Sequence, residues 1–140
     1  MSRLTTLIRL HRWQLNEQRR RVVELETLAE AARGRIVALD EAVAAEGRHA
    51  EMDLTIRATY PAYVAAARER RNKLCETLAT LSGELAEAQE AVTIAFQELK
   101  KYELAEEAKQ RREREFLARR DTIRLDEMAA QGFQRSVSGD

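Results

Sequence analysis

The stretch "LCETLATLSGELAEAQEAVTIAFQELKKY", residues 74–102, decides the fold. From Leu74, steps of alternately four and three residues lead to Tyr102, and every position they meet is apolar or aromatic. The nine positions are Leu74, Leu78, Leu81, Leu85, Ala88, Val92, Ala95, Leu99 and Tyr102. Such heptad spacing is typical of a helix that packs along one face. The stretch therefore predicts one half of a coiled coil.

A second heptad pattern begins near the N-terminus and supplies the other half. Ten of its twelve positions are apolar, and the two exceptions are His11 and Gln18. The positions are Leu4, Ile8, His11, Leu15, Gln18, Val22, Leu25, Ala29, Ala32, Ile36, Leu39 and Val43. The pattern predicts a helix over about residues 3–47, with its apolar seam facing the seam of residues 74–102.

The two patterns are separated by "EGRHAEMDLTIRATYP", residues 46–61, in which Gly47 and Pro61 act as breaks. We expect a connection over about residues 48–60. Pro61 then opens a second helix over about 61–130, since proline is tolerated in a first turn. Gly132 is expected to end that helix before a polar tail over 131–140. The predicted fold is all-α, a long two-helix antiparallel coiled-coil hairpin that forms a single domain over 1–140.

The second helix is expected to outlast the first. With the turn centred near residue 56, residue i faces about residue 112 − i, so Leu4 lies opposite about residue 108. The seam of the second helix loses its apolar character there, at Glu106, Lys109 and Glu113. Residues with high helix propensity nevertheless continue. We therefore expect the chain beyond about residue 110 to overhang as a single helix.

Composition excludes several classes of function. The 140 residues are 34% charged with no net charge, and they include one proline and one cysteine, Cys75. No apolar run approaches the roughly 18 residues of a membrane span. A lone cysteine suits a reducing compartment, so we expect a cytoplasmic protein. A two-helix coil offers no concavity in which catalytic groups converge, so we expect no enzyme, no cofactor and no metal site.

Two segments near the termini are candidate contact surfaces. Trp13 and Leu10 are large apolar residues outside the seam, among basic neighbours. The overhang carries arginines beside apolar residues that match no single seam. The candidate partner-binding residues are Arg9, Leu10, Arg12, Trp13, Arg111, Arg112, Phe116, Arg119, Arg120 and Leu125. Different packing or self-association at this end, and a solvated charged helix, are the simpler alternatives.

The charge pattern narrows the kind of partner. Basic segments 1–23, 57–73 and 109–124 alternate with acidic segments 24–54 and 76–107. A nucleic-acid surface would make the whole domain basic, and membrane binding would need a more apolar helix face. An acidic protein partner fits the arginine clusters better.

Both ends of the chain resemble one protein family. The C-terminal segment "LKKYELAEEAKQRREREFLARRDTIRLDEMAAQGFQR", residues 99–135, is similar to the last helix of the flagellar export protein FliJ family, in which "LDEMA" or "LDEIA" is followed by basic residues. The opening "LTTLIRLHRWQLNEQRRRVVELE", residues 4–26, also resembles that family. Length and two-helix layout agree over nearly the whole chain.

The resemblance implies a specific role. Proteins of this family are antiparallel coiled coils similar to the rotor stalk of rotary ATPases. Their termini enter the hexameric export ATPase and promote its assembly or activity, while another part contacts the membrane export gate and helps to cycle export chaperones. We therefore expect a monomeric, non-enzymatic stalk, peripheral to the membrane-embedded export apparatus. A coiled-coil adaptor or structural dimer without an ATPase partner is the alternative.

Overall fold

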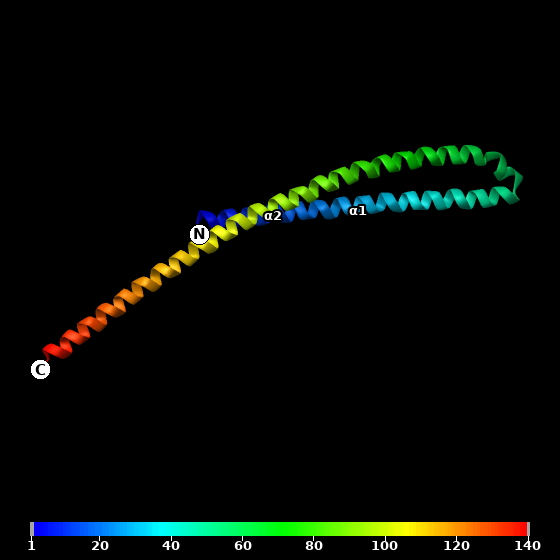
Figure 1. Ribbon diagram of the computed structural model, residues 1–140. Helices are drawn as coiled ribbons and strands as arrows, with labels where there is room; N and C mark the ends of the chain where they lie inside the picture. Colours follow the sequence, from blue (N-terminus) through cyan, green and yellow to red (C-terminus); the bar gives the residue numbers. More distant parts are fainter. Residues whose placement is uncertain (1, 140) are drawn as a thin grey trace. The chain divides into compact units, whose positions relative to one another are not determined.

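The computed structural model describes residues 2–139, and these form two α-helices (Figure 1). Helix α1 spans Arg3–Met52 and helix α2 spans Leu54–Ser138. The described residues contain no strand. The predicted all-α, two-helix antiparallel hairpin is thus confirmed.

The chain divides into two compact units. One, here called the hairpin unit, is Trp13–Phe96; the other, here called the terminal unit, is Met1–Arg12 with Gln97–Asp140. Each unit contains a part of α1 and a part of α2. The single domain over 1–140 that the sequence predicts stays a prediction.

The core of the hairpin unit follows the predicted heptad positions. Leu25, with 1% of its surface exposed, is the large side chain that is most completely enclosed, and it belongs to the seam of α1. Every predicted seam position of this unit is buried or half-buried, while the positions between them are mostly exposed. Burial of a large aliphatic side chain contributes about 1.5–3 kcal/mol, so this seam holds α1 and α2 together.

The predicted connection over residues 48–60 was wrong, because the seam runs through it. Ala50 and Ala67 are buried, and Tyr60 is half-buried. A Cβ atom at Gly47 would lie 2.8 Å from the Tyr60 hydroxyl oxygen. Gly47 therefore does not break α1. It leaves room for an aromatic ring from α2, and this role is invisible when a glycine is judged by helix propensity alone.

The turn between the helices is a single residue, Asp53, and its polar groups are well satisfied. The Asp53 amide donates to the His49 carbonyl at 3.0 Å, and the Asp53 carboxylate accepts from the Thr55 amide at 2.8 Å. The Arg57 guanidinium donates to the carbonyls of Ala50 and Glu51 at 3.0 and 2.8 Å. Three carbonyls at the end of α1 thus gain partners, so a longer loop is unnecessary.

Two further predicted helix ends were wrong. Pro61 lies inside α2 rather than at its start. A proline beyond the first turn removes one backbone hydrogen bond and crowds the carbonyl four residues before it, at a cost of about 3 kcal/mol, which packing elsewhere in the hairpin unit offsets. Helix α2 also passes the expected end near residue 130 and Gly132, and it stops at Ser138. A glycine in an exposed helix costs about 1 kcal/mol, and neighbouring residues with good helix propensity offset that cost.

In the terminal unit, the start of α1 packs on α2. Ile8 and Leu99 are buried, and the rings of His11 and Tyr102 stack with their centroids 4.7 Å apart. Lys109 is the last residue of α2 that is half-buried, and residues 110–139 are all exposed. The expected overhang beyond about residue 110 is therefore confirmed.

Candidate partner-binding surface

The segment of α2 over residues 110–138, here called the tail helix, has no packing partner within the terminal unit. Its backbone stays helical although every side chain is exposed. Arg111 pairs with Glu107 at 3.7 Å and Gln110 donates to Glu106 at 3.2 Å, both one turn apart. Such pairs contribute about 0.2–0.5 kcal/mol each, so local interactions and propensity maintain the helix.

Large apolar side chains are displayed along the tail helix. Phe116 and Leu125 are 67% and 66% exposed. The other large apolar side chains exposed there are Leu117, Ile123, Met128, Phe133 and Val137. An apolar surface of this kind, left uncovered by residues 2–139, is a typical protein-binding feature.

Some of the apolar residues of the tail helix continue the heptad spacing of α2. Phe116, Ile123, Ala130 and Val137 are seven residues apart, and they continue the seam position of Tyr102. The alternate seam position carries charge instead, at Glu113, Arg120 and Glu127. Leu117, Leu125 and Met128 form a second face, because they are rotated away from the first set on an α-helix. The apolar residues thus occupy two faces, as expected of a set that matches no single seam.

Phe133 and Val137 are not among the predicted contact residues. They lie beyond the predicted helix end near residue 130, in the expected polar tail over 131–140. The seven-residue step from Phe116 would have included Val137.

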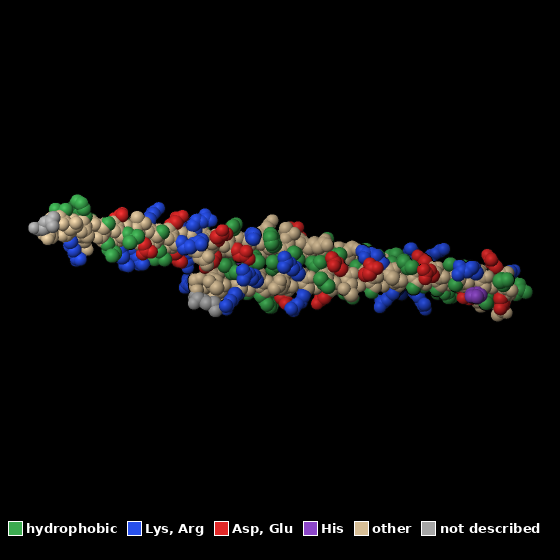
Figure 2. All heavy atoms as spheres, turned by 90° about the horizontal axis from the view of Figure 1, so that it is seen from below, with side chains coloured by type: hydrophobic (Ala, Val, Ile, Leu, Met, Phe, Trp, Pro, Cys, Tyr) green, Lys and Arg blue, Asp and Glu red, His purple; other side chains and the backbone are tan. Residues whose placement is uncertain are grey.

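The predicted arginines differ in whether they pair with an acidic side chain. Arg12 pairs with Glu103 at 3.7 Å, and Arg111 with Glu107. Arg9, Arg112, Arg119 and Arg120 are exposed, and within residues 2–139 none of them has an acidic group within 4.0 Å. Figure 2 shows basic and acidic side chains interspersed with apolar ones along the tail helix. The unpaired arginines are available to an acidic partner.

Leu10 and Trp13 fall in different units, and each is exposed. Leu10, in the terminal unit, is 47% exposed, and Trp13, in the hairpin unit, is 61% exposed. Both side chains are therefore accessible, and their role as contact residues stays a prediction. A shallow surface depression lies on the tail helix itself and is lined by Lys109, Arg112, Glu113, Phe116 and Leu117.

Comparison with known protein families gives one match. The family described as "Flagellar FliJ protein" matches residues 1–138. The chain belongs to the flagellar FliJ family. No curated protein and no solved structure matches it. Membership makes the chain a protein related to flagellar export, and it confirms the resemblance found in residues 4–26 and 99–135.

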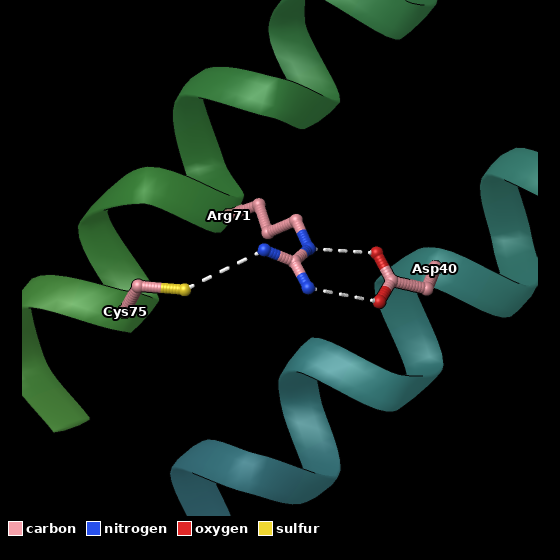
Figure 3. Close-up of polar contacts among 3 residues, drawn as sticks. All are labelled: Asp40, Arg71 and Cys75. Atoms are coloured by element: carbon pink, nitrogen blue, oxygen red, sulfur yellow. Dashed lines mark hydrogen bonds and ion pairs between the residues drawn. The ribbon is translucent and has the colours of Figure 1, made fainter.

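The FliJ-family chain also contains a polar cluster on the hairpin unit (Figure 3). The Arg71 guanidinium of α2 meets the Asp40 carboxylate of α1 through Nε at 3.0 Å and Nη2 at 3.4 Å. Its Nη1 lies 3.7 Å from Cys75 Sγ. The hydrogen bond and charge of Asp40 raise the pKa of Arg71 further above its usual value. Because both partners are about half exposed, this ion pair between the two helices contributes little to stability.

The described part of the FliJ-family chain, residues 2–139, contains neither a cluster of metal-binding side chains nor a helix that could span a membrane. Over residues 2–139, no three His, Cys, Asp or Glu side chains gather as a metal site would require. No helix in the described part of the chain is apolar enough over sufficient length to cross a membrane.

Proposed function

We propose that the protein is a non-enzymatic coiled-coil coupling factor of flagellar export, which binds the export ATPase ring through its terminal unit and promotes ring assembly or activity. One observation carries the proposal: the tail helix is continuous and every residue of it is exposed, yet it displays large apolar side chains beside unpaired arginines. The family match supports the export context.

The physical argument concerns what the tail helix would gain from a partner. Each large apolar side chain contributes about 1.5–3 kcal/mol when it is buried fully. The helix is already formed, so binding would not require the backbone to be ordered. Arginines such as Arg119 and Arg120 would steer the helix towards an acidic surface. A preformed helix with two apolar faces suits insertion between helices or into an opening, as a stalk requires.

The remaining parts of the proposal concern other partners. In the same role, the chain would contact the membrane export gate and assist the cycling of export chaperones, working as a monomer at the cytoplasmic side of the export apparatus. The exposed apolar residues of the hairpin unit, among them Val23, Leu28 and Val37, are available for such contacts.

Removal of the tail helix tests the proposal directly. A chain that ends at Lys109 loses only exposed side chains. Its hairpin should therefore melt at the same temperature as that of the full chain. It should lose stimulation of the export ATPase from the same organism. The measurements are ATP hydrolysis at several protein concentrations and thermal melting followed by circular dichroism. Stimulation equal to that of the full chain would discard the proposal.

Point substitutions provide the matched comparison. Phe116→Ala with Ile123→Ala removes two apolar contacts from the tail helix, while Val23→Ala with Val37→Ala removes two exposed apolar groups from the hairpin unit. We expect only the first pair to weaken stimulation. Likewise, Arg119→Glu with Arg120→Glu should weaken it, whereas Arg68→Glu with Arg70→Glu should not.

The alternative of an adaptor whose seams pair between chains is tested by crosslinking. Leu25 and Ala88 are both buried in the hairpin unit. In a chain with Cys75→Ser, cysteines at positions 25 and 88 should crosslink within one chain. A product that forms only between chains would favour the adaptor.

A further inference from the structure

The start of α1 forms a short contact on α2 in the terminal unit. Residues 3–12 are here called the N-terminal strap. Ile8 of the strap is buried, Leu4 is half-buried and His11 stacks on Tyr102. Leu7 and Leu10 of the same segment remain exposed. The strap is thus held by few apolar contacts.

The seam beneath the strap contains a carboxylate that lacks a partner. Glu106 Oε1 accepts a hydrogen bond from the Gln110 side chain at 3.2 Å. Glu106 Oε2 is buried and has no hydrogen-bond donor among residues 2–139. A buried polar atom without a partner disfavours the packed state, and a charged one does so more strongly.

The hairpin unit shows what this seam position normally holds. Steps of seven residues lead to Glu106 through Leu78, Leu85 and Val92 of the hairpin unit and then Leu99 of the terminal unit. All four are aliphatic and at least half-buried. Glu106 is therefore the first seam residue of this set that opposes packing.

The polar contacts around the strap are weak. Arg12 and Glu103 are 3.7 Å apart, and the Arg12 side chain is 61% exposed. Lys100 pairs with the other oxygen of the Glu103 carboxylate, at 3.8 Å. Exposed pairs of this kind contribute little to stability. A helix end can also fray without forming a new nucleus.

We propose that the strap is releasable, and that its release uncovers a concealed part of the docking face on α2. Tyr102 and Lys109, which lie fourteen and seven residues before Phe116, then extend the exposed face that Phe116 begins on the tail helix. Glu106 becomes free to accept a donor from the partner. The docking part of this proposal rests on the proposed function, because it takes the export ATPase as the partner. The release of the strap concerns the chain alone.

Hydrogen exchange of the isolated full chain tests the release. Amides 7–12 lie beyond the first helical turn, so each has a backbone partner whose breaking the experiment reports. We expect them to exchange about tenfold or more faster than amides 15–32 of the hairpin unit. Glu106→Leu should slow them by about tenfold, because it replaces the unpartnered carboxylate by an aliphatic group.

Two further variants make the exchange test specific. Glu107→Leu changes the neighbouring exposed glutamate and should leave amides 7–12 unaffected. Glu106→Gln removes the charge but keeps a polar group, so its effect should be smaller than that of Glu106→Leu. Equal protection of amides 7–12 and 15–32 in the unmodified chain, or no change with Glu106→Leu, would overturn the releasable strap.

A locked strap tests its part in docking. With Cys75→Ser as background, cysteines at positions 11 and 102 can be joined by a short bismaleimide, since the two side chains stack. The locked chain should stimulate the export ATPase at least about fivefold less than the same chain before crosslinking. Unchanged stimulation would overturn the concealed docking face. If the unmodified chain does not stimulate the ATPase, the proposed function fails, while hydrogen exchange still decides whether the strap opens.

Discussion

The hairpin unit and the terminal unit use the same helix, α2, in opposite ways. In the hairpin unit its seam positions from Leu74 onward are aliphatic and covered by α1. Leu25, on the seam of α1, is almost completely enclosed there. In the terminal unit the seam passes through Glu106 and Lys109 and then becomes exposed. The backbone does not change, because residues with good helix propensity continue. A helix can therefore persist after its packing ends, and the exposed part is available to another molecule.

The largest predicted effect on the free energy of unfolding comes from comparing a buried leucine with an exposed one. Leu25→Ala should lower the free energy of unfolding by about 2–5 kcal/mol, because it removes an enclosed side chain and leaves a cavity. Leu125→Ala, on the tail helix, should change it by less than about 0.5 kcal/mol. Urea denaturation followed by circular dichroism measures both. Similar losses at the two sites would mean that the tail helix packs within the chain.

The next effect concerns the one-residue turn of the hairpin unit. Arg57→Ala removes two hydrogen bonds to carbonyls at the end of α1, each contributing about 0.5–1.5 kcal/mol. We expect a loss of about 1–2 kcal/mol in the free energy of unfolding. Arg68→Ala, an exposed arginine of the same helix, serves as the control and should have little effect. A loss as large for the control would show that the carbonyl contacts do not stabilise the turn.

A pair of glycines tests the close contact near the turn. A Cβ at Gly34 would meet no atom within 4 Å, whereas one at Gly47 would lie 2.8 Å from the Tyr60 hydroxyl. Gly34→Ala should therefore raise the free energy of unfolding by about 0.5–1 kcal/mol, since alanine is the better helix former. Gly47→Ala should give no such gain, and adding Tyr60→Phe should restore part of it. A full gain at Gly47 alone would argue against the contact.

The smallest effect concerns the exposed Arg71–Asp40 pair. Asp40→Asn should lower the melting temperature slightly, and 1 M salt should reduce the difference from the unmodified chain. The pKa of Arg71 is raised, so its contribution is fully present below the ordinary pKa and is lost only as the pH rises through the raised value. The difference should thus be constant between pH 6 and 9. A loss of the difference within that range would point to another titrating group.

The sequence predicted the helices and their seams better than the helix ends. Periodicity is a property of many residues together, so one polar exception such as His11 does not hide it. A helix end depends on a few local contacts. Gly47 and Pro61 were read as breaks, but Tyr60 packs over the glycine and α2 continues through the proline.

The candidate surface was also predicted in part. The apolar and basic residues of the tail helix were identified from composition, and the structure shows them exposed. Arg12 could not be recognised as paired, because its partner Glu103 is distant in the sequence. Glu106 could be placed on the seam, but only packing shows that one of its oxygens is buried without a donor.

By itself, the sequence determined the fold class, the two seams and the point near residue 110 where packing ends, because each depends on spacing along one chain. The tertiary structure decided what lies across each seam. The one-residue turn, the fit of Gly47 to Tyr60, the Arg71–Asp40 pair and the unpartnered Glu106 all depend on side chains brought together by folding. Such contacts follow from distances in space, which helical periodicity alone does not specify.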